Sequence, residues 1–315
     1  MKATAFHSGM HLEERGLRPT ESKCPLCFFG GERSAVLRLQ SEPDVSLLAC
    51  PNCGGFSASR LPTEEALRTY YSKYYQQGIF QDAEKVTFDD SQRFAKHLVR
   101  KAEPFLRAQG LRILDFGGGG GNLSISIARL LLENGAPHVH VVLVDYNAAL
   151  ASTDSQDISL ECHQSLASAS ATDCDLVLAS GILEHIPYPQ EDFTRLLSAL
   201  RPGGLFYART PCVASLFHIL QRIGLPVDFT FPAHVHDMGE EYWSNILRLL
   251  PAKFQHYSVI WSHPSIVETT LRKNPMRTVA AYVMKSPWRT LGNRYRFVGG
   301  WEVLIRRPLE SRGEK

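Results

Sequence analysis

The sequence lacks three features that would each have indicated a class of function. It has no apolar run of about 18 residues, so we expect no membrane span. Residues 1–16 contain no apolar core of an export signal, so we expect a cytoplasmic protein. The charge is nearly balanced, with 34 basic and 32 acidic residues, which argues against a nucleic-acid partner by charge alone.

Cysteine is scarce, but four of the seven cysteines stand in two Cys-x-x-Cys pairs. Four thiolates on two such knuckles complete the tetrahedral shell of one zinc ion and leave no place for water, which predicts a structural role. The alternative is a pair of disulfides or surface thiols, which a reducing compartment disfavours. We expect a flexible tail over residues 1–22 and a zinc ribbon over residues 23–60. The predicted ligands are Cys24, Cys27, Cys50 and Cys53.

Beyond the ribbon, short apolar runs alternate with helical stretches, which predicts βαβ units and a parallel sheet. Residues 61–106 are expected to be a helical linker, in which Tyr71, Tyr74 and Tyr75 form a lid or pack against the domain. A second domain is expected over residues 107–315. Its predicted strands and helices cover residues 111–116, 122–133, 138–144, 158–162, 176–179, 191–200, 205–208, 258–261 and 301–305.

A run of five glycines, residues 117–121, follows the first of these strands. Glycine lets the backbone approach a ligand closely, although such a loop alone would also suit a simple turn or a dinucleotide. Asp145 ends the next strand, where a carboxylate accepts both hydroxyls of a ribose. The segment Leu200-Arg201-Pro202-Gly203-Gly204 is expected to be a sharp turn before the fifth strand.

Together these motifs resemble the class I S-adenosylmethionine-dependent methyltransferases. The resemblance covers residues 107–210 and includes Asp175-Leu176-Val177 leading to Leu183-Glu184-His185-Ile186. It implies a Rossmann-like α/β fold with a mostly parallel seven-stranded sheet. It also implies cofactor contacts: Gly117, Gly119 and Gly121 along methionine and ribose, Asp115 fixing the loop, Asp145 on the ribose, Tyr146 and Gln164 at adenine, and Ser180 beside the sulfonium.

Methyl transfer to a hydroxyl requires removal of a proton, and histidine suits this task near neutral pH. His185 follows the fourth strand, and His234 and His236 form a second candidate pair. Each of the three could instead have a structural role.

The four-cysteine module and the tyrosine-rich segment after it resemble zinc-ribbon methyltransferases whose catalytic halves are similar to ubiquinone-type O-methyltransferases. This implies a small-molecule acceptor, methylated on oxygen, in sugar, lipid or secondary metabolism. One alternative is an RNA methyltransferase, because residues 271–315 contain eleven basic and three acidic residues. Another is a non-catalytic scaffold that binds the cofactor. The motifs say nothing of the oligomeric state.

Overall fold

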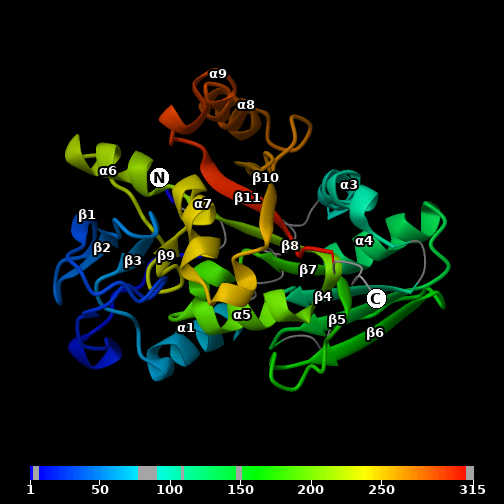
Figure 1. The fold of residues 1–315 in the computed structure, drawn as a ribbon. Helices are drawn as coiled ribbons and strands as arrows, with labels where there is room; N and C mark the ends of the chain where they lie inside the picture. Colours follow the sequence, from blue (N-terminus) through cyan, green and yellow to red (C-terminus); the bar gives the residue numbers. More distant parts are fainter. Residues whose placement is uncertain (3–6, 77–90, 108–109, 147–150, 310–315) are drawn as a thin grey trace.

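A seven-stranded sheet forms the centre of the computed structural model, which describes residues 1–2, 7–76, 91–107, 110–146 and 151–309 (Figure 1). Its strand order is β10-β11-β8-β7-β4-β5-β6, and only β11 runs antiparallel to its neighbours. This confirms the predicted Rossmann-like fold. Both late strands form, but of these two only β10 is an edge strand, because β11 lies between β10 and β8. The strands are β4 Leu111–Phe116, β5 Val139–Val144, β6 Ile158–His163, β7 Cys174–Ser180, β8 Leu200–Cys212, β10 Ser258–Pro264 and β11 Gly299–Arg306.

Helices cover both faces of this sheet, so its central strands are apolar on both sides. One face packs against α3 and α4, with Leu98 and Ile127 in its core. The other packs against α5 and α7, with Phe193 and Trp243 in its core (Figure 1). The helices are α1 Glu64–Gln76, α3 Ser91–Ala102, α4 Asn122–Glu133, α5 Pro189–Ala199, α6 Ala214–Arg222, α7 Glu240–Leu249, α8 Pro275–Lys285 and α9 Trp288–Leu291.

The cysteine module forms a second, four-stranded antiparallel sheet beside the first. Three of its strands are β1 Ser34–Gln40, β2 Val45–Ala49 and β3 Phe56–Ala58. The fourth, β9 His236–Asp237, comes from the second domain and pairs with β3. The cysteine module is thus joined to the second domain by strand pairing rather than appended to it.

The amino-terminal segment differs from the flexible tail that the sequence predicts. Leu12 and Leu17 are buried against Leu61 and Phe231. The side chain of Gln40 also accepts from the backbone N–H of Leu12 at 2.8 Å and donates to its carbonyl at 2.9 Å. The sparse apolar residues of this segment have no helix or strand period, so nothing in the local sequence shows that distant partners bury them.

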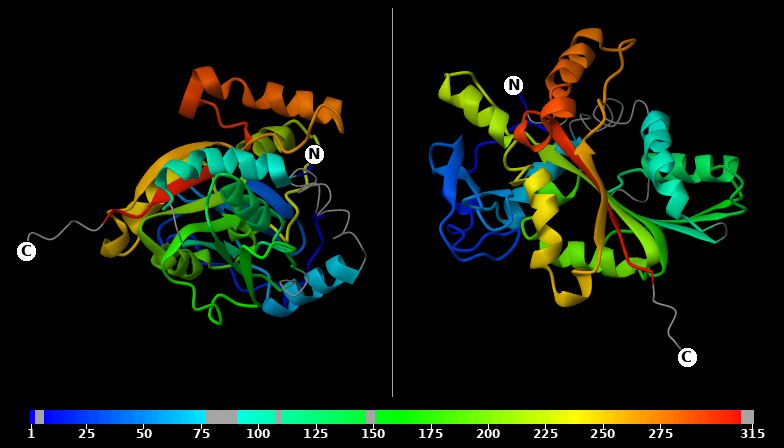
Figure 2. Two further views of the ribbon diagram at one scale, coloured as in Figure 1. Left: turned by 90° about the vertical axis from the view of Figure 1, so that its right-hand side faces the viewer. Right: turned by 45° about the horizontal axis from the view of Figure 1, so that its top comes forward.

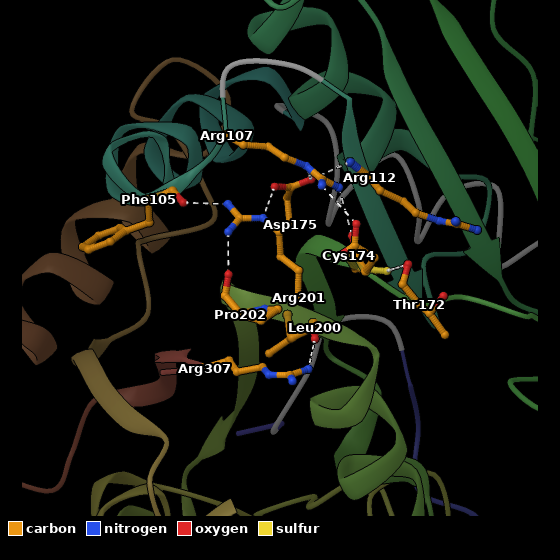
Figure 3. Close-up of polar contacts among 11 residues, drawn as sticks. Phe105, Arg107, Arg112, Thr172, Cys174, Asp175, Leu200, Arg201, Pro202 and Arg307 are labelled. Atoms are coloured by element: carbon orange, nitrogen blue, oxygen red, sulfur yellow. Dashed lines mark hydrogen bonds and ion pairs between the residues drawn. The ribbon is translucent and has the colours of Figure 1, made fainter. Parts of the chain in front are cut away.

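Ionic contacts gather where β4, β7 and β8 begin, at the amino edge of the parallel strands (Figure 3). The buried carboxylate of Asp175 accepts from Arg107 Nε at 2.9 Å, from Arg201 Nε at 2.5 Å and from the backbone N–H of Arg112 at 2.9 Å. The predicted sharp turn at residues 200–204 lies inside β8 rather than before it. β8 already begins at Leu200, its register against β7 shifts between Leu200 and Leu205, and Gly203 has a φ of 79°. These motif residues therefore hold strand ends together.

Candidate functional site

The loop after β4 has the backbone shape expected of a cofactor cradle. Gly117, Gly119 and Gly121 have φ values of 73°, 57° and 76°, a region that favours glycine. A Cβ atom at Gly117 would lie 2.5 Å from Cγ1 of Ile182, so a larger residue would collide with the segment after β7. Helix α4 begins directly after this loop, and its N-terminal N–H groups face the same edge of the sheet.

Asp145 meets this loop although it lies well beyond it in the sequence. Its Oδ2 accepts the backbone N–H of Gly119 at 3.0 Å, because β4 and β5 pair in parallel and end at the same level. The structure therefore brings together the glycine loop and the aspartate that the sequence singled out. Contact of Asp145 with a ribose remains a prediction.

Two buried polar atoms at the same edge have no hydrogen-bond partner among the described residues: Oδ2 of Asp115 and Oγ of Ser180. Burial raises the pKa of Asp115 to about 6. Buried polar atoms normally find partners, so unpaired ones at a ligand edge indicate where a polar ligand could bind. The residues present thus fit the polar groups of S-adenosylmethionine.

The two residues predicted to contact adenine lie at the correct edge but are open to solvent. Tyr146 follows Asp145 and is 83% exposed. Gln164 follows β6 and is also exposed. The structure shows neither residue packed on another part of the site, so their role at adenine remains a prediction.

Two of the three candidate bases meet in a histidine cluster that the sequence did not predict in full. The rings of His185 and His234 lie 4.7 Å apart between centroids. His7, which sequence analysis placed in a tail, lies 5.0 Å from His185 and 5.9 Å from His234. We name His7, His185 and His234 the histidine cluster. No motif marks His7, which reaches the site only through long-range packing of the amino terminus.

The hydrogen bonds of His185 define its tautomer. Its Nδ1 lies 3.0 Å from the carbonyl oxygen of Ala233, which can only accept, so Nδ1 carries the proton in the neutral ring. The hydroxyl of Tyr71 lies 3.1 Å from the same nitrogen. Nε2 is then the acceptor nitrogen of His185. Tyr71 thus contacts His185, and whether it forms a lid or packs against the domain remains a prediction. The side chains of Tyr74 and Tyr75 lie outside the described residues.

His236 does not join the cluster, which corrects its pairing with His234 as a base. Its Nε2 lies 2.9 Å from the carbonyl oxygen of Ile186, and its Nδ1 lies 3.0 Å from Ser57 Oγ. Both ring nitrogens are therefore engaged by the protein. The physical reason is local backbone structure. His234 follows directly on a turn and its backbone N–H donates to the carbonyl of Thr230 at 3.2 Å, whereas His236 belongs to β9, which pairs with the ribbon strand β3.

Burial sets the charge of this region. It lowers the pKa of His185 well below its usual value, that of His234 to about 3 and that of His7 to about 4. It raises the pKa of Glu184 to about 8. At pH 7 the histidines are neutral and most of this carboxyl is protonated, so the cluster does not repel a sulfonium.

Glu184 extends the histidine cluster into a group with the composition of a cation site. One ligand atom from each of Glu184, His185 and His234 lies within 4.8 Å of the other two. Nδ1 of His234 and Oε2 of Glu184 are buried without a hydrogen-bond partner among the described residues. Neutral imidazole nitrogens and the Glu184 carboxyl, once it has lost its proton, could hold a divalent cation here.

The four predicted zinc ligands converge at the ribbon. The Sγ atoms of Cys24 and Cys53 are 3.9 Å apart, and those of Cys27 and Cys50 are 3.7 Å apart. A zinc ion with bonds of about 2.3 Å to four sulfurs places them about 3.8 Å apart. A disulfide would require about 2.05 Å, so the geometry fits a closed zinc shell and not two disulfides.

Comparison with known proteins identifies the family of this chain. Residues 88–263, more than half of the chain, match the family described as Methyltransferase domain. The chain therefore belongs to this family, and it is an S-adenosylmethionine-dependent methyltransferase. This rules against the alternative of a non-catalytic scaffold. Within the described residues no helix is long and apolar enough to cross a membrane.

The chain is also similar to individual methyltransferases. The ubiquinone biosynthesis O-methyltransferase of Xanthomonas axonopodis pv. citri (strain 306) is 32% identical over 202 residues, which are 63% of this chain and 75% of that protein. The enzyme of the same name from Xanthomonas campestris pv. campestris (strain B100) is 30% identical over 62% of this chain and 73% of that protein. The solved magnesium protoporphyrin IX methyltransferase of Synechocystis PCC 6803 aligns with 71% of this chain and 86% of that chain, with 17% identity and a TM-score of 0.42.

Proposed function

We propose that this enzyme methylates a hydroxyl of a small-molecule acceptor in sugar, lipid or secondary metabolism, with His185 as general base. The observation that carries the proposal is the tautomer of His185: the carbonyl of Ala233 holds the proton on Nδ1 and leaves Nε2 as an acceptor at the carboxyl edge of the sheet. The relatives support an oxygen acceptor, since both are named O-methyltransferases.

The residues that would hold the cofactor are Gly117, Gly119, Gly121, Asp145 and Ser180. S-adenosylmethionine supplies a methyl group on a positively charged sulfur. A hydroxyl oxygen becomes strongly acidic as it bonds to this carbon, so a weak base is sufficient to take its proton. His185 is neutral at pH 7 because burial lowers its pKa, and its Nε2 therefore accepts that proton without first losing one.

The test has two parts. First, the protein is incubated with labelled methyl donor and fractionated cell extract, and we expect label in a small metabolite; label in RNA would refute the proposed acceptor. Second, His185→Asn should lower kcat by about 10²- to 10⁴-fold with unchanged cofactor affinity. The matched control is His138→Asn, an exposed histidine at the start of β5, which should leave kcat unchanged.

If His185→Asn keeps the wild-type kcat, His185 is not the base. Repeating the assay after chelation and after adding back Zn²⁺, Fe²⁺ or Ni²⁺, which suit imidazole ligands, separates proton transfer from cation binding. A cation at Glu184, His185 and His234 would make activity depend on the added metal. A base alone would not.

A further inference from the structure

The segment between β10 and β11 has an unusual charge. Residues 269–301 contain seven Lys or Arg and no Asp or Glu. The rest of the chain then has 27 basic and 32 acidic residues and is negative overall, so the net positive charge of the protein comes from this one segment. This segment includes α8 and α9, which stand out from the body of the molecule (Figure 2).

Helix α8 is amphipathic, but its polar side faces the protein and its apolar side faces the solvent. Its inward side is polar: Thr278 is buried and its hydroxyl lies 2.8 Å from that of Thr269, and Lys285 Nζ lies 2.9 Å from Ser265 Oγ. At 100° per residue, positions 276, 279, 280 and 283 lie on the opposite side. Met276, Val279 and Val283 are 84%, 50% and 65% exposed. A helix that presents its apolar side to water indicates a surface that something covers.

Further exposed side chains extend this side into a patch with both apolar and basic members. Leu271 and Leu291 are exposed and flank α8 in the sequence. Arg272, Arg277 and Arg289 are exposed as well. We name these eight residues the α8 patch: Leu271, Arg272, Met276, Arg277, Val279, Val283, Arg289 and Leu291.

The α8 patch belongs to the edge of the sheet that carries the candidate site. β11 begins at Gly299, which pairs with Cys212, the last residue of β8. β8 runs parallel to β7 and β4, so its end lies at the carboxyl edge, where the glycine loop and Ser180 also lie. Whatever covers the patch therefore lies on the same side of the sheet as the cofactor edge.

We propose that the α8 patch docks on an anionic lipid surface. An in-plane helix with apolar residues on one side and cations beside them matches a membrane interface, where acyl chains take the apolar side chains and headgroup phosphates take the arginines. Contact with a second copy would set the same cations against each other. Contact with RNA would leave Met276 and Val283 in water. The inference does not depend on the acceptor proposed above.

The experiment is sedimentation of the full-length protein with vesicles. We expect it to pellet with phosphatidylcholine vesicles that contain phosphatidylglycerol, to remain in solution with phosphatidylcholine alone, and to release as salt is raised. Met276→Ser combined with Val283→Ser should weaken binding by about tenfold or more. Arg272→Gln combined with Arg277→Gln should weaken it by about 30-fold. Both pairs are exposed, so circular dichroism should show an unchanged fold.

Leu309→Ser is the matched control, because Leu309 is also exposed but follows the far end of β11. It should bind vesicles as the wild type does. No binding to the anionic vesicles, or equal binding by Met276→Ser/Val283→Ser, overturns the proposal. So does a dimer in sedimentation velocity that this double variant abolishes, or salt-sensitive binding of RNA or of an acidic protein through the patch in place of vesicles.

Discussion

His236 offers a quantitative test of how burial controls the stability of this enzyme. Burial lowers its pKa from 6.5 to about 4. The unfolded chain therefore binds the proton more tightly, so the contribution of His236 is complete above pH 6.5 and is lost as the pH falls from 6.5 toward 4. From these two pKa values the loss amounts to about 1.4 kcal/mol at pH 5.5 and about 2 kcal/mol at pH 5.0.

The variant that isolates this contribution is His236→Gln. Glutamine can donate to the carbonyl of Ile186 and accept from Ser57, as the histidine does, but it does not titrate. The assay is urea unfolding from pH 7.5 to 5.0, followed by tryptophan fluorescence. We expect the variant to lose about 2 kcal/mol less than the wild type at pH 5.0. Zinc release and the other buried groups titrate in both proteins and cancel in the difference.

His138→Gln is the matched control, because it removes an exposed histidine and should leave the pH profile unchanged. If the profiles of His236→Gln and wild type stay parallel over the whole range, burial does not hold His236 neutral and the reasoning is wrong. A large loss at pH 7.5 alone would show a packing defect. The test would then still depend on how differently the free energies of unfolding of the two proteins change with pH.

Three other predictions concern the cofactor, the metal and the ionic network. Asp145→Asn should weaken S-adenosylhomocysteine binding in calorimetry by about 10- to 100-fold, while the exposed Asp157→Asn should not. Metal analysis of reduced protein should find one zinc per chain, and Cys53→Ser should lose it and make the ribbon the first site of proteolysis. Asp175→Ala should reduce the free energy of unfolding by about 3–5 kcal/mol, because it leaves Arg201 without its buried partner; unchanged stability would contradict this.

Much of the catalytic half could be predicted because its signals are local. A strand, a glycine loop and a helix follow one another within residues 111–133, and parallel pairing then requires that Asp145 lie near the loop. The four-cysteine cluster could be predicted equally well, since each Cys-x-x-Cys pair is a local knuckle. Short spacing and fixed backbone geometry make such features readable without a structure.

What sequence analysis missed depends on contacts between distant segments. His7 enters the histidine cluster because its segment packs on residues far along the chain. The separation of His234 from His236 follows from the pairing of β9 with β3, and two residues are too short a run to show a strand period. The Pro-Gly-Gly segment suggests a turn before the strand by composition, yet it forms a bulge near the start of β8, where Arg201 donates to Asp175.

The pairing of β3 with β9 has a consequence for synthesis on the ribosome. Ser57 and His236 are 179 positions apart, so the last strand of the ribbon sheet is synthesised long after its first three strands. During this interval β3 has no partner at its free edge, and a zinc ion on the four cysteines would hold the module together. We therefore expect zinc starvation to impair folding of the ribbon while the chain is still being synthesised. It should lower the yield of folded enzyme more than it lowers the activity of enzyme that is already folded.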